Sequence, residues 1–110
     1  MTLGSVYRVI DMLLDEDVNM HPMGYDISHL EAEIRRLNQE AVNWRIMGDR
    51  AMFMSCRGDA GLLQELVSLL LVGDLAKAGE LVHKRMDRGL QKRIPARLFA
   101  KITGKWLAEK

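Results

Sequence analysis

Cysteine is almost missing from this sequence of 110 residues, which contains only Cys56. One thiol can form no disulfide within the chain and no cysteine-rich metal site. Proline is scarce too, at Pro22 and Pro95 alone, and clusters of β-branched and aromatic residues that alternate with the period of two typical of a strand are absent. These scarcities favour an all-α protein of a reducing compartment, which we expect to be cytoplasmic.

Long apolar runs and catalytic motifs are lacking as well. The longest apolar run, Leu66 to Val72, is far shorter than the ~20 residues of a transmembrane helix. The histidines His21, His29 and His83 share no metal-ligand spacing, and none of them lies near Cys56 in the sequence. We therefore expect no membrane contact, no metal, no cofactor and no small-molecule substrate, and we predict that the protein is not an enzyme.

The remaining composition is typical of one folded domain covering residues 1–110. Hydrophobic residues make up 48% of the chain and charged residues 28%, which is sufficient for a packed core. Apolar positions spaced three or four apart predict a small helical domain of about five helices. We expect these helices from Ser5 to about residue 20, over residues 26–58, over residues 59–72, over residues 75–88, and from Pro95 to about residue 107.

The longest of these helices is expected to open with a capping box and to end at a glycine. Ser28 and Glu31 have the spacing of the box, and Gly58 suits the first position beyond a helix. At 1.5 Å per residue the helix would be about 45 Å long, more than a domain of this size can cover. A break at Gly48 stays an open alternative, because a glycine inside a helix costs only about 1 kcal/mol relative to alanine.

The same stretch carries an apolar seam whose positions alternate three and four apart, as in a coiled-coil heptad. Such a seam packs against other helices of the chain or pairs with a second copy, and we expect both uses, the second as a homodimer. The possible oligomer seam consists of Ile27, Leu30, Ile34, Leu37, Ala41 and Trp44. Adaptable methionine side chains offer a further candidate groove, although methionines more often fill a core. These methionines are Met47, Met52, Met54 and Met86.

Two connections are predicted in the C-terminal half. Gly73 and Asp74 are the residue types that end one helix and cap the next, so the helices on either side should form an antiparallel hairpin. Gly89 is expected to stop the second helix of this pair. Pro95 suits the first turn of the last helix.

Charge is divided unevenly along the chain, although the net charge is only +1. Residues 1–75 contain six basic and twelve acidic side chains, whereas residues 76–110 contain ten basic and three acidic ones. Helical spacing places the basic side chains outward on the last two long helices, where we expect one basic face that binds a protein or a polyanion. The simpler alternative is a solvated helix surface. The candidate residues are Lys77, Lys84, Arg85, Arg88, Lys92, Arg93, Arg97, Lys101 and Lys105.

An acidic stretch, "DMLLDED", lies near the other end of the chain. Its carboxylates are those of Asp11, Asp15, Glu16 and Asp17. They can meet a basic partner surface or the basic tail of this protein, but a solvated helix end is the interpretation that we favour.

Two functions fit these observations. The first is a small non-enzymatic interaction protein, a regulator, adaptor or inhibitor in the style of phage or mobile-element proteins, which binds another protein through helical surfaces. The alternative is a nucleic-acid-associated regulator whose basic C-terminal third contacts phosphates. The absence of catalytic motifs together with the surplus of charged and apolar stripes favours the first.

Overall fold

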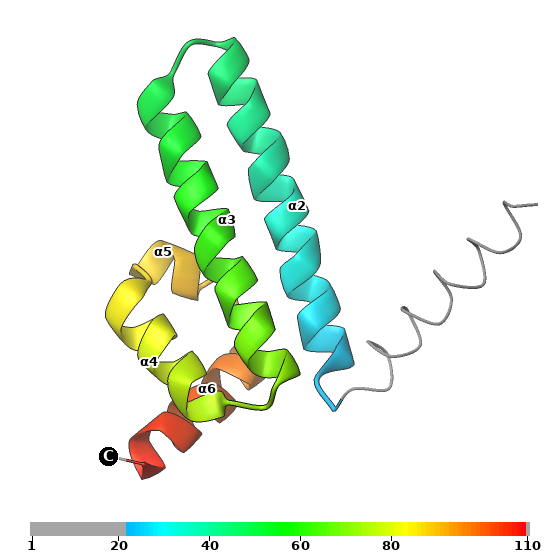
Figure 1. The fold of residues 1–110 in the computed structure, drawn as a ribbon, viewed down its shortest axis with the longest axis vertical. Helices are drawn as coiled ribbons and strands as arrows, with labels where there is room; N and C mark the ends of the chain where they lie inside the picture. Colours follow the sequence, from blue (N-terminus) through cyan, green and yellow to red (C-terminus); the bar gives the residue numbers. More distant parts are fainter. Residues whose placement is uncertain (1–21, 110) are drawn as a thin grey trace, which may run out of the picture.

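A computed structural model of the chain describes residues 22–109. Within this range the protein consists of helices joined by short turns, without a strand (Figure 1). The helices are α2 (Gly24–Ile46), α3 (Arg50–Leu71), α4 (Leu75–Arg85), α5 (Arg88–Gln91) and α6 (Ala96–Ala108). The predicted all-α class is confirmed. The helix predicted from Ser5 to about residue 20 lies outside the described residues.

The longest predicted helix is divided into α2 and α3 at Gly48. This glycine has a φ of +82°, in the left-handed region, and its N–H donates to the carbonyl of Arg45. The N–H of Asp49 donates to the carbonyl of Trp44, which completes the Schellman motif that ends a helix. The Asp49 carboxylate then accepts from the N–H of Met52 at 3.0 Å and so caps α3. The two helices therefore turn back on each other as an antiparallel hairpin.

The connection between α3 and α4 repeats this arrangement. Gly73 has a φ of +77°, and its N–H donates to the carbonyl of Leu70. The N–H of Asp74 donates to the carbonyl of Leu69, and the Asp74 carboxylate accepts from the N–H of Lys77 at 3.1 Å. The predicted roles of Gly73 and Asp74 are confirmed, and α4 turns back to pack beside α3 (Figure 1).

The start predicted for the longest helix is wrong. No side chain caps α2, which begins at Gly24, one turn before Ser28. The earlier start buries Met23 and Ile27 in the core. The apolar contacts of this first turn therefore decide where the helix begins.

The helix end predicted at Gly58 is also wrong. Cys56 and Ala60 are buried one turn apart on either side of the glycine, so one apolar stripe of α3 continues across it. Asp59 accordingly lies inside α3 and does not cap a helix. Its partial burial, together with the carboxylate of Asp87, raises the pKa of Asp59.

The stop predicted at Gly89 is wrong for a similar reason. Helix α4 ends at Arg85, because Met86 enters the core in an extended conformation. The Asp87 carboxylate then accepts from the N–H of Leu90 at 2.8 Å and caps the short helix α5, which contains Gly89. The last predicted boundary is confirmed, because α6 starts immediately after Pro95.

The core lies between α2, the C-terminal part of α3 and the three remaining helices. In Figure 1, α4, α5 and α6 gather beside the lower half of the α2–α3 hairpin. The largest fully buried side chains are Ile27, Leu30, Leu37, Leu63, Leu66, Leu70, Val82, Leu90, Leu98 and Ile102. The apolar stretch predicted over residues 59–72 therefore forms the central part of the core, as the second half of α3.

The contact between α4 and α6 depends on a glycine. Gly79 is buried, and the Cβ of Trp106 occupies the space that a Cβ at position 79 would need. The indole ring of Trp106 stacks on His83 with ring centroids 4.6 Å apart. Nε2 of His83 shares a 2.7 Å hydrogen bond with Oγ1 of Thr103. The two basic helices predicted for the C-terminal third thus pack closely as a pair.

Five of the six seam residues of α2 are buried within the chain. They are Ile27, Leu30, Ile34, Leu37 and Ala41. The sixth, Trp44, lies near the end of α2 and is half-buried. Packing against other helices of the chain, one of the two uses expected of this seam, therefore occupies most of it. A homodimer stays a prediction and requires another surface.

Candidate interaction surface

The end of the α2–α3 hairpin extends beyond the core. Ala41 on α2 and Cys56 on α3 are the last buried residues toward the turn, and none of residues 42–55 between them is buried. Figure 1 shows this part of the hairpin projecting past α4, α5 and α6. We call residues 42–55 the hairpin end.

The hairpin end is apolar although it lies outside the core. Eight of the thirteen residues from 42 to 54 are hydrophobic. Ile46 and Met47, next to the turn, are 78% and 72% exposed. The other large exposed apolar side chains of this region are those of Val42, Met52 and Met54. Of the nine large hydrophobic side chains that are exposed in the described part of the chain, five lie here. Exposed apolar side chains that gather in one region often mark a binding site, so the hairpin end is the best candidate binding surface.

Two grooves open at the hairpin end. One, of about 340 Å³, is lined by Glu40, Asn43, Trp44, Met47 and Met52. The other, of about 560 Å³, is lined by Arg45, Gly48, Arg50, Phe53 and Met54. We call the second one the arginine groove, because two guanidinium groups border its apolar side chains and no carboxylate lines it.

The positive charge of the arginine groove is not balanced within the described part of the chain. Neither Arg45 nor Arg50 forms an ion pair with a residue in the range 22–109. Asp49 lies between them in the sequence, but its carboxylate caps α3. Glu40, in the neighbouring groove, pairs with Arg36 at 2.8 Å. The arginine groove therefore suits an apolar partner that carries negative charge.

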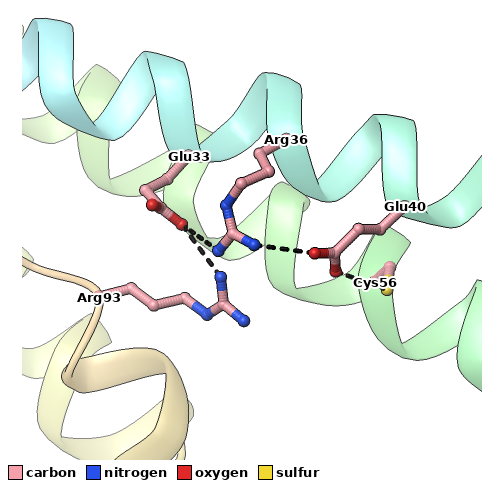
Figure 2. Close-up of polar contacts among 5 residues, drawn as sticks. All are labelled: Glu33, Arg36, Glu40, Cys56 and Arg93. Carbon is pink, nitrogen blue, oxygen red and sulfur yellow. Dashed lines mark hydrogen bonds and ion pairs between the residues drawn. The ribbon is translucent and has the colours of Figure 1, made fainter.

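A series of polar contacts runs along the hairpin below its end (Figure 2). Arg36 joins Glu33 at 2.7 Å to Glu40 at 2.8 Å. The Sγ of Cys56 donates to Glu40 across 4.0 Å. Burial raises the pKa of the Cys56 thiol, and the carboxylates of Glu40 and Asp59 raise it further. Because only the thiolate is a good nucleophile, this environment is that of a packed thiol.

Four of the nine predicted basic residues form ion pairs inside the chain. Arg93, in the loop between α5 and α6, donates to Glu33 of α2 at 3.0 Å and joins the contacts of Figure 2. The other three pairs are Lys84 with Glu80, Arg85 with Glu65, and Lys105 with Glu109. A phosphate would have to compete with these glutamates.

The other five basic residues form no ion pair with a described residue. They are Lys77, Arg88, Lys92, Arg97 and Lys101. Seven of the nine predicted basic residues line grooves, and three separate grooves share them. These are Lys77, Lys84 and Arg85 between α3 and α4, Arg88 and Lys92 beside Phe99, and Arg97 and Lys101 beside Pro22 and Met23. No single groove therefore gathers more than three of the predicted basic residues.

The methionines of the predicted partner groove are divided between two places. Met47, Met52 and Met54 lie at the hairpin end, whereas Met86 is buried in the core. Ile46 and the two arginines of the groove were not among the binding residues predicted from the sequence. A cluster of apolar residues centred on a Gly-Asp helix break could have indicated them. Helix α2 ends and helix α3 begins at this break, so few other residues are near enough to cover the apolar side chains.

A comparison of the chain with protein-family models, with curated proteins and with solved structures found no match. Within residues 22–109, no group of three or more histidine, cysteine, aspartate or glutamate side chains is placed to hold a metal ion. No helix of the same range has a stretch both long and apolar enough to cross a membrane.

Proposed function

We propose that this protein is a non-enzymatic interaction protein, a regulator, adaptor or inhibitor that binds another protein through the hairpin end. The observation that carries the proposal is that none of residues 42–55 is buried, although they lie on two paired helices and include several large apolar side chains. Side chains such as Ile46 and Met47 take no part in the core, so they are available to a partner. Complete burial of one such side chain contributes about 1.5–3 kcal/mol, and a few of them offset much of the entropic cost of association.

The proposal is tested by placing charge on the hairpin end. In the double variant Ile46→Glu, Met47→Glu, capture of the partner from a lysate of the source cells should fall at least tenfold. The partner is identified by mass spectrometry and purified, and its affinity for both proteins is then measured by calorimetry. The expected loss follows from burying two carboxylates without counter-charges in an apolar interface.

The matched control is the double variant Ala32→Glu, Gln39→Glu. These two residues are exposed in the middle of α2, so the control adds the same charge to the same helix away from the hairpin end. It should retain wild-type capture and affinity. Equal loss in both variants, or equal retention, would contradict the proposal.

Nucleic-acid binding through the C-terminal third is the second candidate function. It is favoured by the five basic side chains that have no ion pair with a described residue. Titration of labelled duplex and single-stranded nucleic acid at 50 and 200 mM salt separates the two functions, with affinity falling by roughly a factor of 10 or more if several phosphates are contacted. The variant Arg88→Gln, Lys92→Gln should weaken such binding. Absence of binding at 50 mM salt would eliminate this candidate.

A further inference from the structure

We propose that the arginine groove binds residues 5–18 of a second copy of this chain, so that the protein forms a reciprocal dimer. This inference rests on the proposed function of the hairpin end and names its partner. A symmetric contact of one hairpin end with another is disfavoured, because it would bring Arg45 and Arg50 of both copies together with no carboxylate in the groove. The groove therefore calls for an acidic segment that also offers apolar side chains.

The carboxylates of the described chain are largely engaged. Glu33, Glu40, Glu65, Glu80 and Glu109 are in ion pairs. Asp49, Asp74 and Asp87 cap helices. The densest group of carboxylates outside these contacts is that of residues 11–17, with Asp11, Asp15, Glu16 and Asp17. The charge that the groove lacks is thus present elsewhere in the same sequence.

The same segment has the apolar pattern that the groove requires. Its apolar residues Val6, Val9, Ile10, Leu13 and Leu14 are spaced as on one face of a helix. Arg8 is the only basic residue among the first twenty, so the segment carries a net negative charge. A segment with this acidic and apolar pattern fits a groove that is lined by Phe53, Met54 and two arginines.

The length of the chain favours binding between copies. Pro22 lies at the start of α2, whereas Arg45 lies 21 residues after Gly24, about 31 Å along the helix. Asp15, Glu16 and Asp17 are at most seven residues from Pro22, a span of about 25 Å even when fully extended. The backbone of these three acidic residues therefore cannot come alongside Arg45 of its own copy, whereas Asp11, eleven residues from Pro22, can.

Two copies side by side in antiparallel orientation solve this problem. The start of α2 in one copy then lies next to the hairpin end of the other, and each copy supplies its segment to its partner. The arrangement closes with two-fold symmetry, which limits the assembly to a dimer.

The test exchanges the charges between the two halves of the contact. One variant carries Arg45→Glu and Arg50→Glu, and the other carries Asp11→Lys and Asp15→Lys. Sedimentation equilibrium should show a dimer for the wild type at micromolar concentration. For each variant alone, the dissociation constant of the dimer should rise roughly 100-fold, because like charges meet at both contacts. An equimolar mixture of the variants should regain the dimer, since opposite charges meet again.

Circular dichroism of each variant checks that its helices are intact. A monomeric wild type, an unchanged dimer in either folded variant, or a mixture that stays monomeric would overturn the inference. A hairpin end that still captures a different protein in the preceding experiment would then leave the proposed function standing. Loss of capture in both the hairpin-end variant and its control would instead count against the proposed function, whatever the sedimentation experiment shows.

Discussion

Gly79→Ala is expected to lower the free energy of unfolding by about 2–3 kcal/mol, although alanine is the better helix former by about 1 kcal/mol. The added Cβ would overlap the Cβ of Trp106 and lie 2.7 Å from its Cγ. Both atoms are close to the backbone of α6 and cannot rotate away. The helices α4 and α6 must therefore move apart, which also disturbs the stacking of Trp106 on His83. Urea denaturation followed by circular dichroism measures the change.

The matched controls are Gly58→Ala and Gly61→Ala. Both glycines lie inside α3 with open space where a Cβ would be added. Here helix propensity alone acts, and each substitution should stabilise the protein by about 0.5–1 kcal/mol. A stabilising effect of alanine at all three positions would contradict the close approach of α4 and α6.

Leu63→Ala is expected to destabilise the protein by about 3–4 kcal/mol, because it leaves a cavity in the middle of the core. Leu63 is completely buried, at 0% exposure, and belongs to the cluster that joins α2, α3 and the C-terminal helices. Thermal and urea unfolding of the variant would show this loss. A variant that is molten or unfolded at 37 °C is consistent with the same result.

The matched control for Leu63→Ala is Ile46→Ala at the hairpin end. Its side chain is 78% exposed, so its truncation should change the free energy of unfolding by less than about 0.5 kcal/mol. The contrast between the two variants tests whether the hairpin end is separate from the core. A loss above about 1.5 kcal/mol for Ile46→Ala would show that the hairpin end is packed in solution.

Three Gly-Asp pairs in the sequence show how well local residue types predict helix boundaries. The pairs at 48–49 and 73–74 both end one helix and cap the next, whereas the pair at 58–59 lies inside α3. The difference comes from the buried residues on either side: the stripe through Cys56 and Ala60 continues across Gly58. Residue type alone does not distinguish these cases, because tertiary contacts determine whether the helix ends at the glycine or continues through it.

The class of fold and most core positions could be predicted, because they follow from helical periodicity. The seam residues from Ile27 to Ala41 and the apolar part of α3 are buried as that pattern indicates. The candidate site could be predicted only in part. Met47 and Met52 have the same apolar character as core residues. They are exposed because the hairpin extends beyond the helices that pack beside it. The ion pair of Arg93 with Glu33 could not be predicted from the sequence either, since it joins residues sixty positions apart.

Hydrogen exchange of the purified protein, alone and with its captured partner, shows whether residues 42–55 form the binding surface. In the monomer, at a concentration below the dissociation constant of the dimer, the hairpin end should exchange faster than the core, because its backbone lies at the exposed end of two helices. On binding, we expect amides of residues 42–55 to become protected, while those of α5 and α6 stay unchanged. Protection confined to residues 84–105, with no change at the hairpin end, would exclude the hairpin end as the binding surface and assign binding to the basic C-terminal third.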